Sequence, residues 1–236
     1  MASSTHHESP GIGRIVERQM RNWELAQAQR GAVPLSGGRQ VADFIAISRA
    51  VGLPGREVAT LLNLKLGWPI FDREILQAMA GDDECRRQLY ESMDERDLNW
   101  LESLVEGMSG GRGLRDDYFN RLSETILSLA RKGHAIFLGR AADLILPQDV
   151  GLRIRIHARR DYCVAAYARS KNVTPERAAR EIEEIEHERA RFIRHHFGME
   201  VNDPGRCDIF LNMERFSVQQ AADVILSALR VKGTIS

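Results

Sequence analysis

Short apolar runs separated by amphipathic stretches make up most of the chain after residue 40. Five of these runs have the length of a buried strand, and they are FIAIS (44–48), WPIF (68–71), HAIFL (134–138), GLRIRIHA (151–158) and CDIFLNM (207–213). Helical patterns lie between the runs. Because strands separated by helices pair in parallel through right-handed crossovers, the pattern predicts an α/β sandwich with a five-stranded parallel sheet.

The amphipathic stretches predict helices at 56–66, across most of 73–131, at 174–198 and at 218–229. Within the second stretch, the glycine-rich residues 107–113 (GMSGGRG) predict a loop. The helix at 174–198 has its start marked in the sequence. Thr174 is the expected N-cap, and Pro175 stands at the first helical position.

The first 40 residues differ in pattern from the sandwich. Residues 1–13 contain little apolar material and predict a flexible N-terminus, whereas 14–30 carry apolar positions at helical spacing and predict a helix. Residues 31–40 (GAVPLSGGRQ) read as a linker. We therefore divide the chain into an N-terminal part, 1–40, and a main domain, 41–236. The helix either packs on the domain or contacts a partner, such as a second copy of the chain in a homodimer.

Composition narrows the class of protein. Lys and Arg together number 33, as do Asp and Glu, so the formal net charge is zero and the basic excess typical of nucleic-acid binders is missing. Anion binding must therefore depend on locally placed arginines. Three widely spaced cysteines argue against a disulfide framework or a structural zinc site. With no secretory h-region and no apolar run of transmembrane length, we expect a cytoplasmic protein that binds neither nucleic acid nor a membrane.

The residues after the first expected strand, RAVGLPGREVATLL (49–62), are candidates for a phosphate loop. A glycine-bearing turn that enters a helix offers backbone N–H groups and the positive end of the helix dipole to a phosphate. The strict signature G-x-x-x-x-G-K-[ST] is not met. If Gly55 is its second glycine, then Ala50, Arg56 and Glu57 replace the first glycine, the lysine and the hydroxyl residue. An ordinary strand-to-helix turn explains these residues equally well.

Some residues of this loop favour phosphate binding, and others oppose it. Arg49 and Arg56 flank it, so two guanidinium groups could fork onto phosphate oxygens close to Gly52. Pro54 offers no N–H. Glu57 would repel a phosphate unless it points away or meets a metal ion.

Gly139 and Arg140 follow the third expected strand directly. Ligands of parallel sheets bind at the carboxyl ends of the strands. A glycine lets a ligand approach the backbone, and an arginine can grip a phosphate with two hydrogen bonds. The alternative role of Arg140 is an ion pair with Asp143.

An arginine interrupts the apolar stripe of the helix at 174–198. Ile182, Ile185, Arg189 and Phe192 follow one another at helical spacing, so Arg189 is expected to face inward. A buried charge without a partner is very costly, so Arg189 needs either a carboxylate or a substrate phosphate beneath a helical lid. Arg194 is a second, weaker candidate for the same role.

Five motifs occur in a familiar order: ISR-x-x-G-x-x-GRE-x-A, an aromatic residue followed by Asp-Arg-Glu-Ile-Leu, GR-x-AD, ER-x-x-F-x-R-x-x-FG, and D-I-x-L-N. Together they make residues 43–230 resemble the cytidylate kinase-like family, a divergent branch of the cytidylate kinases. The resemblance implies a P-loop kinase sandwich with a five-stranded parallel sheet and a helical lid. It also implies ATP as phosphoryl donor, Mg²⁺ as cofactor, and a nucleoside monophosphate or similar small molecule as acceptor.

The resemblance also implies roles for individual residues. The donor phosphates would lie against Gly52–Arg56, and Asp72 would lie beside the acceptor. Arg140 would grip the acceptor's phosphate, while Arg189 and Arg194 would be lid arginines. Phosphoryl transfer depends mostly on positioning and charge stabilisation, so Arg56, Arg140 and Arg189 are the expected catalytic residues.

The chain departs from the family at the positions that matter for activity. Leu53 and Pro54 replace glycines, and Ala141 replaces the acid that in cytidylate kinases helps to recognise cytosine. Glu57 stands where a hydroxyl residue would ligate magnesium, with Asp143 as a substitute, so the sequence names no certain metal ligand. These departures leave two alternatives to an active kinase: a nucleotide-binding regulatory pseudokinase, and a scaffold acting through residues 14–30.

Overall fold

The computed structural model describes residue 21 and residues 41–91, 93, 95–109 and 117–235 of the 236-residue chain. The helix expected at 14–30, the division at residue 40 and the dimer contact fall outside these residues and stay predictions. No helix in the described ranges is both long and apolar enough to cross a bilayer.

A five-stranded sheet forms the centre of the molecule, as predicted. Its strands are β1 (Phe44–Arg49), β2 (Ile70–Asp72), β3 (Ala135–Leu138), β4 (Leu152–His157) and β5 (Ile209–Asn212). They run in the order β2-β3-β1-β4-β5, and every neighbouring pair is parallel. Because all strands point the same way, the residues that follow them meet at one edge.

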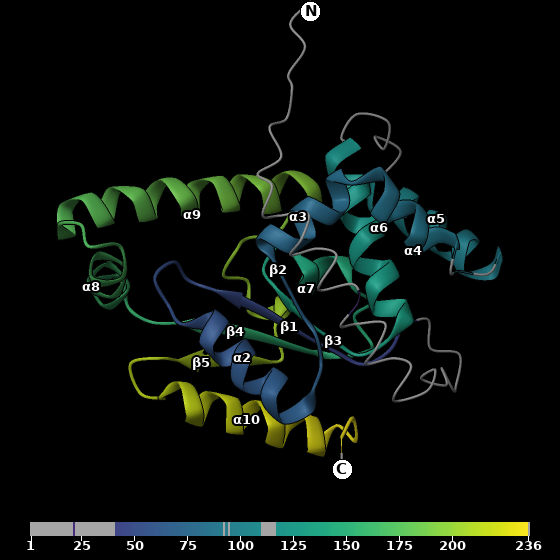
Figure 1. The fold of residues 1–236 in the computed structure, drawn as a ribbon. Coiled ribbons are helices and arrows are strands. Elements are labelled where there is room, and N and C mark those ends of the chain that lie inside the picture. The colour runs from purple at the N-terminus through teal and green to yellow at the C-terminus, as the bar shows by residue number, and fades with distance from the viewer. Residues whose placement is uncertain (1–20, 22–40, 92, 94, 110–116, 236) are drawn as a thin grey trace, which may run out of the picture.

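Helices cover both faces of the sheet (Figure 1). One face carries α2 (Gly55–Leu66) and α10 (Val218–Val231). The other carries α3 (Arg73–Gly81), α4 (Asp83–Glu91), α5 (Glu95–Ser109), α6 (Asp117–Lys132) and the short α7 (Ala142–Ile145). Two further helices, α8 (Arg160–Lys171) and α9 (Pro175–Phe197), extend beyond the carboxyl edge, and a 3₁₀ turn, η1 (Pro204–Arg206), precedes β5.

The loop expected at 107–113 begins later than predicted, because α5 continues through Ser109. A glycine inside a helix costs about 1 kcal/mol relative to alanine, but it does not end the helix as proline does. Gly107 is therefore helical.

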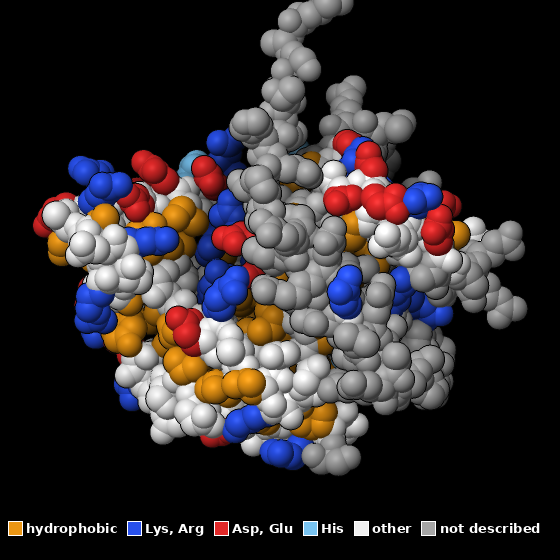
Figure 2. Space-filling model, in the orientation of Figure 1, with side chains coloured by type: hydrophobic (Ala, Val, Ile, Leu, Met, Phe, Trp, Pro, Cys, Tyr) orange, Lys and Arg blue, Asp and Glu red, His pale blue; other side chains and the backbone are white. Residues whose placement is uncertain are grey.

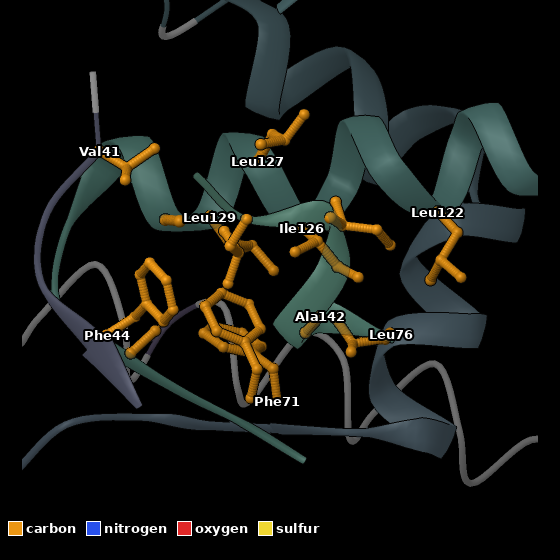
Figure 3. Close-up of a cluster of buried hydrophobic side chains, with 14 of the residues drawn as sticks. Val41, Phe44, Phe71, Leu76, Leu122, Ile126, Leu127, Leu129 and Ala142 are labelled. Atoms are coloured by element: carbon orange, nitrogen blue, oxygen red, sulfur yellow. The ribbon is translucent and has the colours of Figure 1, made fainter. Parts of the chain in front are cut away.

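The alternation of side chains along β1 builds two separate cores. Phe44 and Ala46 belong to the core beneath α3–α6, whereas Ile45 and Ile47 belong to the core beneath α2 and α10. Figure 3 shows Phe44 and Phe71 of the first core lying against apolar side chains of α6. Both faces of the sheet are thus apolar, which is typical of a parallel sheet.

Strand β4 departs from this pattern on the face of the first core. Ile154 and Ile156 point into the second core, but the opposite face carries Arg153 and Arg155, both buried. Arg153 donates hydrogen bonds to the carbonyl oxygens of Asp143 at 2.9 Å, Leu146 at 3.0 Å and Val150 at 2.9 Å, and to that of Pro147. Its charge is thereby dispersed over the backbone between α7 and β4.

Helix α9 crosses the carboxyl edge of the sheet and is the longest helix in the described part of the chain (Figure 1). Its start is as predicted: the Thr174 hydroxyl accepts from the N–H of Arg177 at 3.3 Å, and Pro175 occupies the first helical position. At the other end, the ring of His196 stacks on that of Phe119 in α6 with centroids 4.1 Å apart. Toward the start of the helix, Glu181 accepts a hydrogen bond from Tyr167 of α8 at 3.0 Å, so α9 is held by α8 toward one end and by α6 at the other.

The turn between β3 and α7 has an unusual backbone. Arg140 and Ala141 both adopt left-handed conformations, with φ of 57° and 54°, and the N–H of Ala142 bonds to the carbonyl of Gly139 at 3.3 Å. This is the geometry of a type I′ turn, which favours Asn and Gly at its two central positions. Each L-residue held there costs about 1–2 kcal/mol.

We expect Arg153→Met to lower the free energy of unfolding by about 2–4 kcal/mol. Methionine fills similar space but leaves the carbonyls of Pro147 and Val150 without another donor among the described residues, and each buried, unsatisfied carbonyl costs about 1–3 kcal/mol. Urea unfolding followed by circular dichroism measures the change. Arg169→Met, on the exposed side of α8, is the control and should change stability by less than about 0.5 kcal/mol. Equal effects of the two variants would contradict the role given to Arg153.

Ala141→Gly should stabilise the protein slightly, and Ala142→Gly should destabilise it. Glycine at 141 relieves a left-handed strain of about 1–2 kcal/mol and loses one methyl worth about 0.8 kcal/mol. Ala142 is buried and has a helical backbone. Glycine at 142 therefore loses the buried methyl and lowers the helix propensity, and it relieves no strain. The two variants should therefore differ by about 2 kcal/mol in denaturant unfolding. A more stable Ala142→Gly would show that the turn at 140–141 is not strained.

Candidate active site

A cavity of about 280 Å³ lies at the carboxyl edge of the sheet, between the ends of β1, β3 and β4 and the underside of α9. We call it the arginine cavity, because six arginines line it: Arg49, Arg73, Arg140, Arg155, Arg189 and Arg206. Figure 2 shows blue Lys and Arg side chains gathered in the middle of this face, between α9 and α2. A chain with no net charge thus concentrates positive charge in one place.

Arg49 and Gly55 interlock at the centre of the β1–α2 loop. A Cβ added to Gly55 would overlap the Cδ of Arg49, and one added to Gly139 would lie 3.6 Å from Nη1 of the same arginine. The Arg49 side chain therefore runs from the loop toward the end of β3. Burial, followed by repulsion from Arg56, lowers the pKa of Arg49.

The backbone of the loop is partly satisfied within itself. The N–H of Gly55 donates to the carbonyl of Leu53 at 2.8 Å, and Pro54 between them has φ −79° and ψ 54°. These values define an inverse γ-turn. The N–H of Gly55, one of the donors that the sequence suggested for phosphate, is consequently engaged.

Helix α2 still offers donors at its start. Its N-cap is Pro54, and no side chain caps it. The N–H groups of Arg56 and Glu57 lie in the first turn, where a helix supplies no backbone partner. These two N–H groups and the helix dipole remain available to an anion.

Arg56 does not enter the cavity. Its guanidinium forms an ion pair with Oδ2 of Asp72, and its side chain is 64% exposed. Oδ1 of Asp72 accepts from the N–H groups of Glu74 at 3.1 Å and Ile75 at 3.0 Å, which caps α3. Asp72 thus holds two structural partners, and Arg56 is drawn away from the place of a phosphate-loop lysine.

Gly52 allows the loop to lie in close contact with α8. It has φ 87°, and an added Cβ would lie 2.6 Å from the carbonyl oxygen of Cys163. Any larger residue would push α8 away from the loop. The arm formed by α8 and α9 is therefore seated directly on the loop.

Arg140 reaches the cavity from the strained turn after β3. Its Nη2 donates to Oε1 of Gln77 at 2.6 Å, while its buried Nε has no partner among the described residues. Burial lowers the pKa of Arg140. The ion pair with Asp143 that the sequence offered as an alternative does not form. Strain held at such a position is typical of a functional site.

Asp143 forms a buried ion pair with Arg206 instead. The two groups are 2.6 Å apart, and each side chain is only 3% exposed. Arg206 also donates to the carbonyls of Glu200 at 3.3 Å and Val201 at 2.8 Å. Asp143 therefore has a structural partner, and the metal-ligand role considered for it from the sequence stays a prediction.

Arg189 faces inward from α9, as its place on the apolar stripe predicts. Its Nη1 donates to the carbonyl oxygen of Arg49 at 3.0 Å, and no carboxylate in the described part forms an ion pair with it. Burial, followed by repulsion from Arg49 and Arg155, lowers the pKa of Arg189 to about 10. At neutral pH the Arg189 guanidinium stays charged. Glu186 offsets the repulsion from the neighbouring arginines only in part.

Like Arg56 and Asp72, two further predicted residues do not line the cavity. Arg194 pairs with Glu200 at 2.9 Å, and both side chains are exposed. Glu57 is exposed in the first turn of α2, and it forms no ion pair with a described residue. Within the same residues, no three His, Cys, Asp or Glu side chains gather as a metal cluster would require.

The sequence reasoning missed three arginines of the cavity: Arg73, Arg155 and Arg206. Arg155 had a readable signal, because the alternation in LRIRIH places two arginines on one face of a buried strand. Arg73 directly follows β2, so the rule applied to Arg140 would have found it. Arg206 lies in a 3₁₀ turn outside any pattern.

A second cavity of about 510 Å³ adjoins the first and shares Arg155, Arg189 and Val201 with it. It lies between β4, β5, α8 and α9, and it includes Ala50 at the start of the β1–α2 loop. Its remaining lining is mixed, with Ile182 and Phe210 among the apolar residues.

Comparisons with known proteins agree with this architecture. The model of the cytidylate kinase-like family matches residues 44–215. An uncharacterized protein from Eubacterium ventriosum superposes with a TM-score of 0.65 at 19% identity, over 82% of this chain and 99% of that one.

More distant matches include a shikimate kinase from Bacteroides thetaiotaomicron, with a TM-score of 0.43, 10% identity, and 81% and 98% of the two chains covered. A gluconokinase from Sinorhizobium meliloti has a TM-score of 0.42, 13% identity, and 81% and 94% covered. No curated protein matches the chain. The family model spans well over half of the sequence, so the chain belongs to the cytidylate kinase-like family, which supports a kinase-type activity on a small substrate.

Proposed function

We propose that this protein transfers the γ-phosphoryl group of ATP to a small acceptor bound in the arginine cavity. One observation carries the proposal. Five guanidinium groups converge on the cavity without an ion pair to any described residue: Arg49, Arg73, Arg140, Arg155 and Arg189. Phosphoryl transfer needs positive charge around the phosphoryl oxygens more than it needs a nucleophilic side chain.

The donor would lie along the β1–α2 loop. Its phosphates would accept from the N–H groups of Arg56 and Glu57 at the uncapped start of α2. Its nucleoside would occupy the larger cavity, which begins at Ala50 and offers the apolar side chains of Ile182 and Phe210 among polar ones. This placement directs the γ-phosphate toward Arg49 and Arg189.

Arg49 would take over the role of the phosphate-loop lysine. Arg56 stands at the lysine position in the sequence, but its side chain leaves the loop to pair with Asp72. Arg49 lies between the loop and the end of β3, where donor and acceptor would meet. A guanidinium there can bind two phosphate oxygens at once.

Magnesium would be held mainly by the phosphates of the donor. Mg²⁺ in kinases is bound by one or two carboxylates together with substrate phosphates and water. Glu57 fits this requirement, since it is exposed at the loop and free of ion pairs to described residues. When bound, the ion would neutralise charge that develops on the donor.

In the transfer step, an acceptor oxygen forms a bond to the γ-phosphorus while the bond from that phosphorus to ADP breaks. Arg140 would hold the acceptor, and Arg189 would approach the transferring group from α9. Because Arg189 already bonds to the backbone of β1, the lid arginine is positioned before the substrates bind. Arg194, paired with Glu200 outside the cavity, could join only after a change of partner.

A nucleotide-binding regulator without phosphoryl transfer is the second candidate. The γ-turn at Pro54 favours it, because the Gly55 N–H is engaged and Pro54 has none to give. Both candidates require ATP binding, so only turnover separates them. Slow ADP formation from ATP and Mg²⁺ without an acceptor would already support the transferase.

Arg49→Met should weaken ATP binding about tenfold or more, whereas Arg56→Met should weaken it less than about threefold. A hydrogen bond to a charged group is worth about 1.5–3 kcal/mol, which corresponds to a factor of ten or more. Arg56 is largely exposed, and surface ion pairs contribute about 0–1 kcal/mol. Isothermal titration with ATP and Mg²⁺ measures both constants. The reverse order of effects would return the lysine role to Arg56, and no binding by the unaltered protein would overturn the proposed function.

Arg189→Met should leave the unliganded protein as stable as the original or slightly more stable, because it removes a cation that its neighbours repel. The same change should reduce turnover by about 10³ or more, as the loss of a charge-stabilising arginine does in phosphoryl transfer. Thermal melting and ADP release give the two readouts. Arg191→Met, exposed on the other side of α9, is the matched control and should change neither. An earlier melt with normal turnover per folded molecule would make Arg189 a structural residue.

A further inference from the structure

We infer that the acceptor is a compact molecule with two anionic groups, such as a phosphorylated small acid, rather than a nucleoside monophosphate. The inference rests on the proposed function, because it concerns the acceptor side of the same cavity. It follows from the positions of the arginines, the polar groups available to a ligand, and the size of the cavity.

The arginines that remain for the acceptor lie on two sides. Arg140 follows β3, and Arg73 at the start of α3 is close enough to repel it. Arg155 lies on β4, opposite Ser48 of β1, so β1 separates it from β3. Adjacent strands are about 4.8 Å apart, which places the backbone of Arg155 roughly 10 Å from the end of β3 across the sheet, so the two side chains enter the cavity from different sides. A phosphate bound on the β3 side by Arg140 and Arg73 would leave Arg155 to bind a second anionic group.

Arg155 has the features of a ligand-binding group. It is 9% exposed, and its Nη2 donates to Oδ1 of Asn202 at 3.0 Å. Its buried Nε has no partner among the described residues. Burial, followed by repulsion from Arg206, lowers the pKa of Arg155. A buried guanidinium with an unused donor and no ion-pair partner in the described part of the chain fits an anion bound to it.

The cavity offers hydrogen-bond donors but few acceptors. Asp143 is held by Arg206, and Glu188 lies exposed at the rim. The Ser48 hydroxyl donates to the carbonyl of Ile154 at 3.4 Å, which leaves its oxygen as one of the few side-chain acceptors among the described lining residues. A nucleobase presents both donors and acceptors, so a site that reads it needs acceptors as well. A ligand made of phosphate and carboxylate oxygens needs donors alone. The described lining therefore matches a polyanion.

The volume agrees with a small ligand. Pockets for small molecules usually measure about 300–1,000 Å³, and the arginine cavity, with about 280 Å³, lies just below this range. A free space of this size fits a molecule of a few carbons that carries two anionic groups.

A matched pair of probes isolates the second anionic group. We would titrate the unaltered protein with 3-phosphoglycerate, with glycerol 3-phosphate, which lacks the carboxylate, and with cytidine monophosphate. The expected order has 3-phosphoglycerate binding at least about tenfold more tightly than either other probe, since a charged hydrogen-bonded pair is worth that factor. Tighter binding of cytidine monophosphate, or equal binding of the two three-carbon probes, would overturn the inference.

Arg155→Met identifies the group that reads the second anion. In this variant the preference for 3-phosphoglycerate over glycerol 3-phosphate should fall to less than about threefold. The unliganded variant should melt no earlier than the original protein, because it loses a repelled, incompletely bonded cation. A preserved preference would refute the assignment. ATP affinity is measured separately, so loss of the proposed function is distinguishable: a protein that binds 3-phosphoglycerate but no ATP would keep the inference and lose the donor.

Discussion

Guanidinium groups at the carboxyl edge of the sheet repel one another, and the surrounding structure has to offset this repulsion. The molecule offsets it differently for each arginine. Arg206 is neutralised by the buried carboxylate of Asp143, and Arg56 is drawn outward to Asp72. Arg49 and Arg189 are treated otherwise. Arg189 donates to the backbone carbonyl of Arg49, and the pKa values of both guanidinium groups are lowered first by burial and then by repulsion from neighbouring arginines. The charges left uncompensated are those that face the cavity. An anion bound there would gain from relief of that repulsion as well as from its own contacts.

The packing of the surrounding helices holds the arginines of this site in fixed positions. Helix α9 is hydrogen-bonded to α8 through Glu181 and Tyr167 and stacked on α6 through His196, so Arg189 is presented by an element held on both sides of it. The two left-handed residues after β3 direct Arg140 toward the same space, at an energetic cost that the packing of α7 has to offset. Positioning of this kind is what phosphoryl transfer asks of a protein, because rigidly held charges need not reorganise as the transition state forms.

The sequence predicted the fold well because the physics that sets it is local. Short apolar runs separated by helical patterns predicted the sheet, and the end of β3 and the stripe on α9 predicted Arg140 and Arg189. The remaining features depend on distant parts of the chain. Asp143 and Arg206 are 63 positions apart, and nothing in either segment predicts that they pair in preference to Arg140 and Asp143. The diversion of Arg56 to Asp72 likewise depends on the distance between the β1–α2 loop and the start of α3, which only packing sets. Arg155 was within reach of local reasoning, since strand alternation places it beside Arg153 on one face.

Gly55 illustrates how one motif position can be retained for a different physical reason. In a phosphate loop, the glycine before the lysine lets the backbone approach a phosphate. Here its N–H is engaged with Leu53, and the space where a Cβ would lie is filled by the Arg49 side chain. In this loop, a packed guanidinium group therefore replaces part of the set of backbone N–H donors that a phosphate loop normally offers. An amide offers a fixed partial charge, whereas a partly buried guanidinium offers a full charge that salt screens only weakly. Loss of the usual glycines and lysine therefore does not by itself imply loss of phosphate binding, because the same space can be served by a side chain from the end of β1.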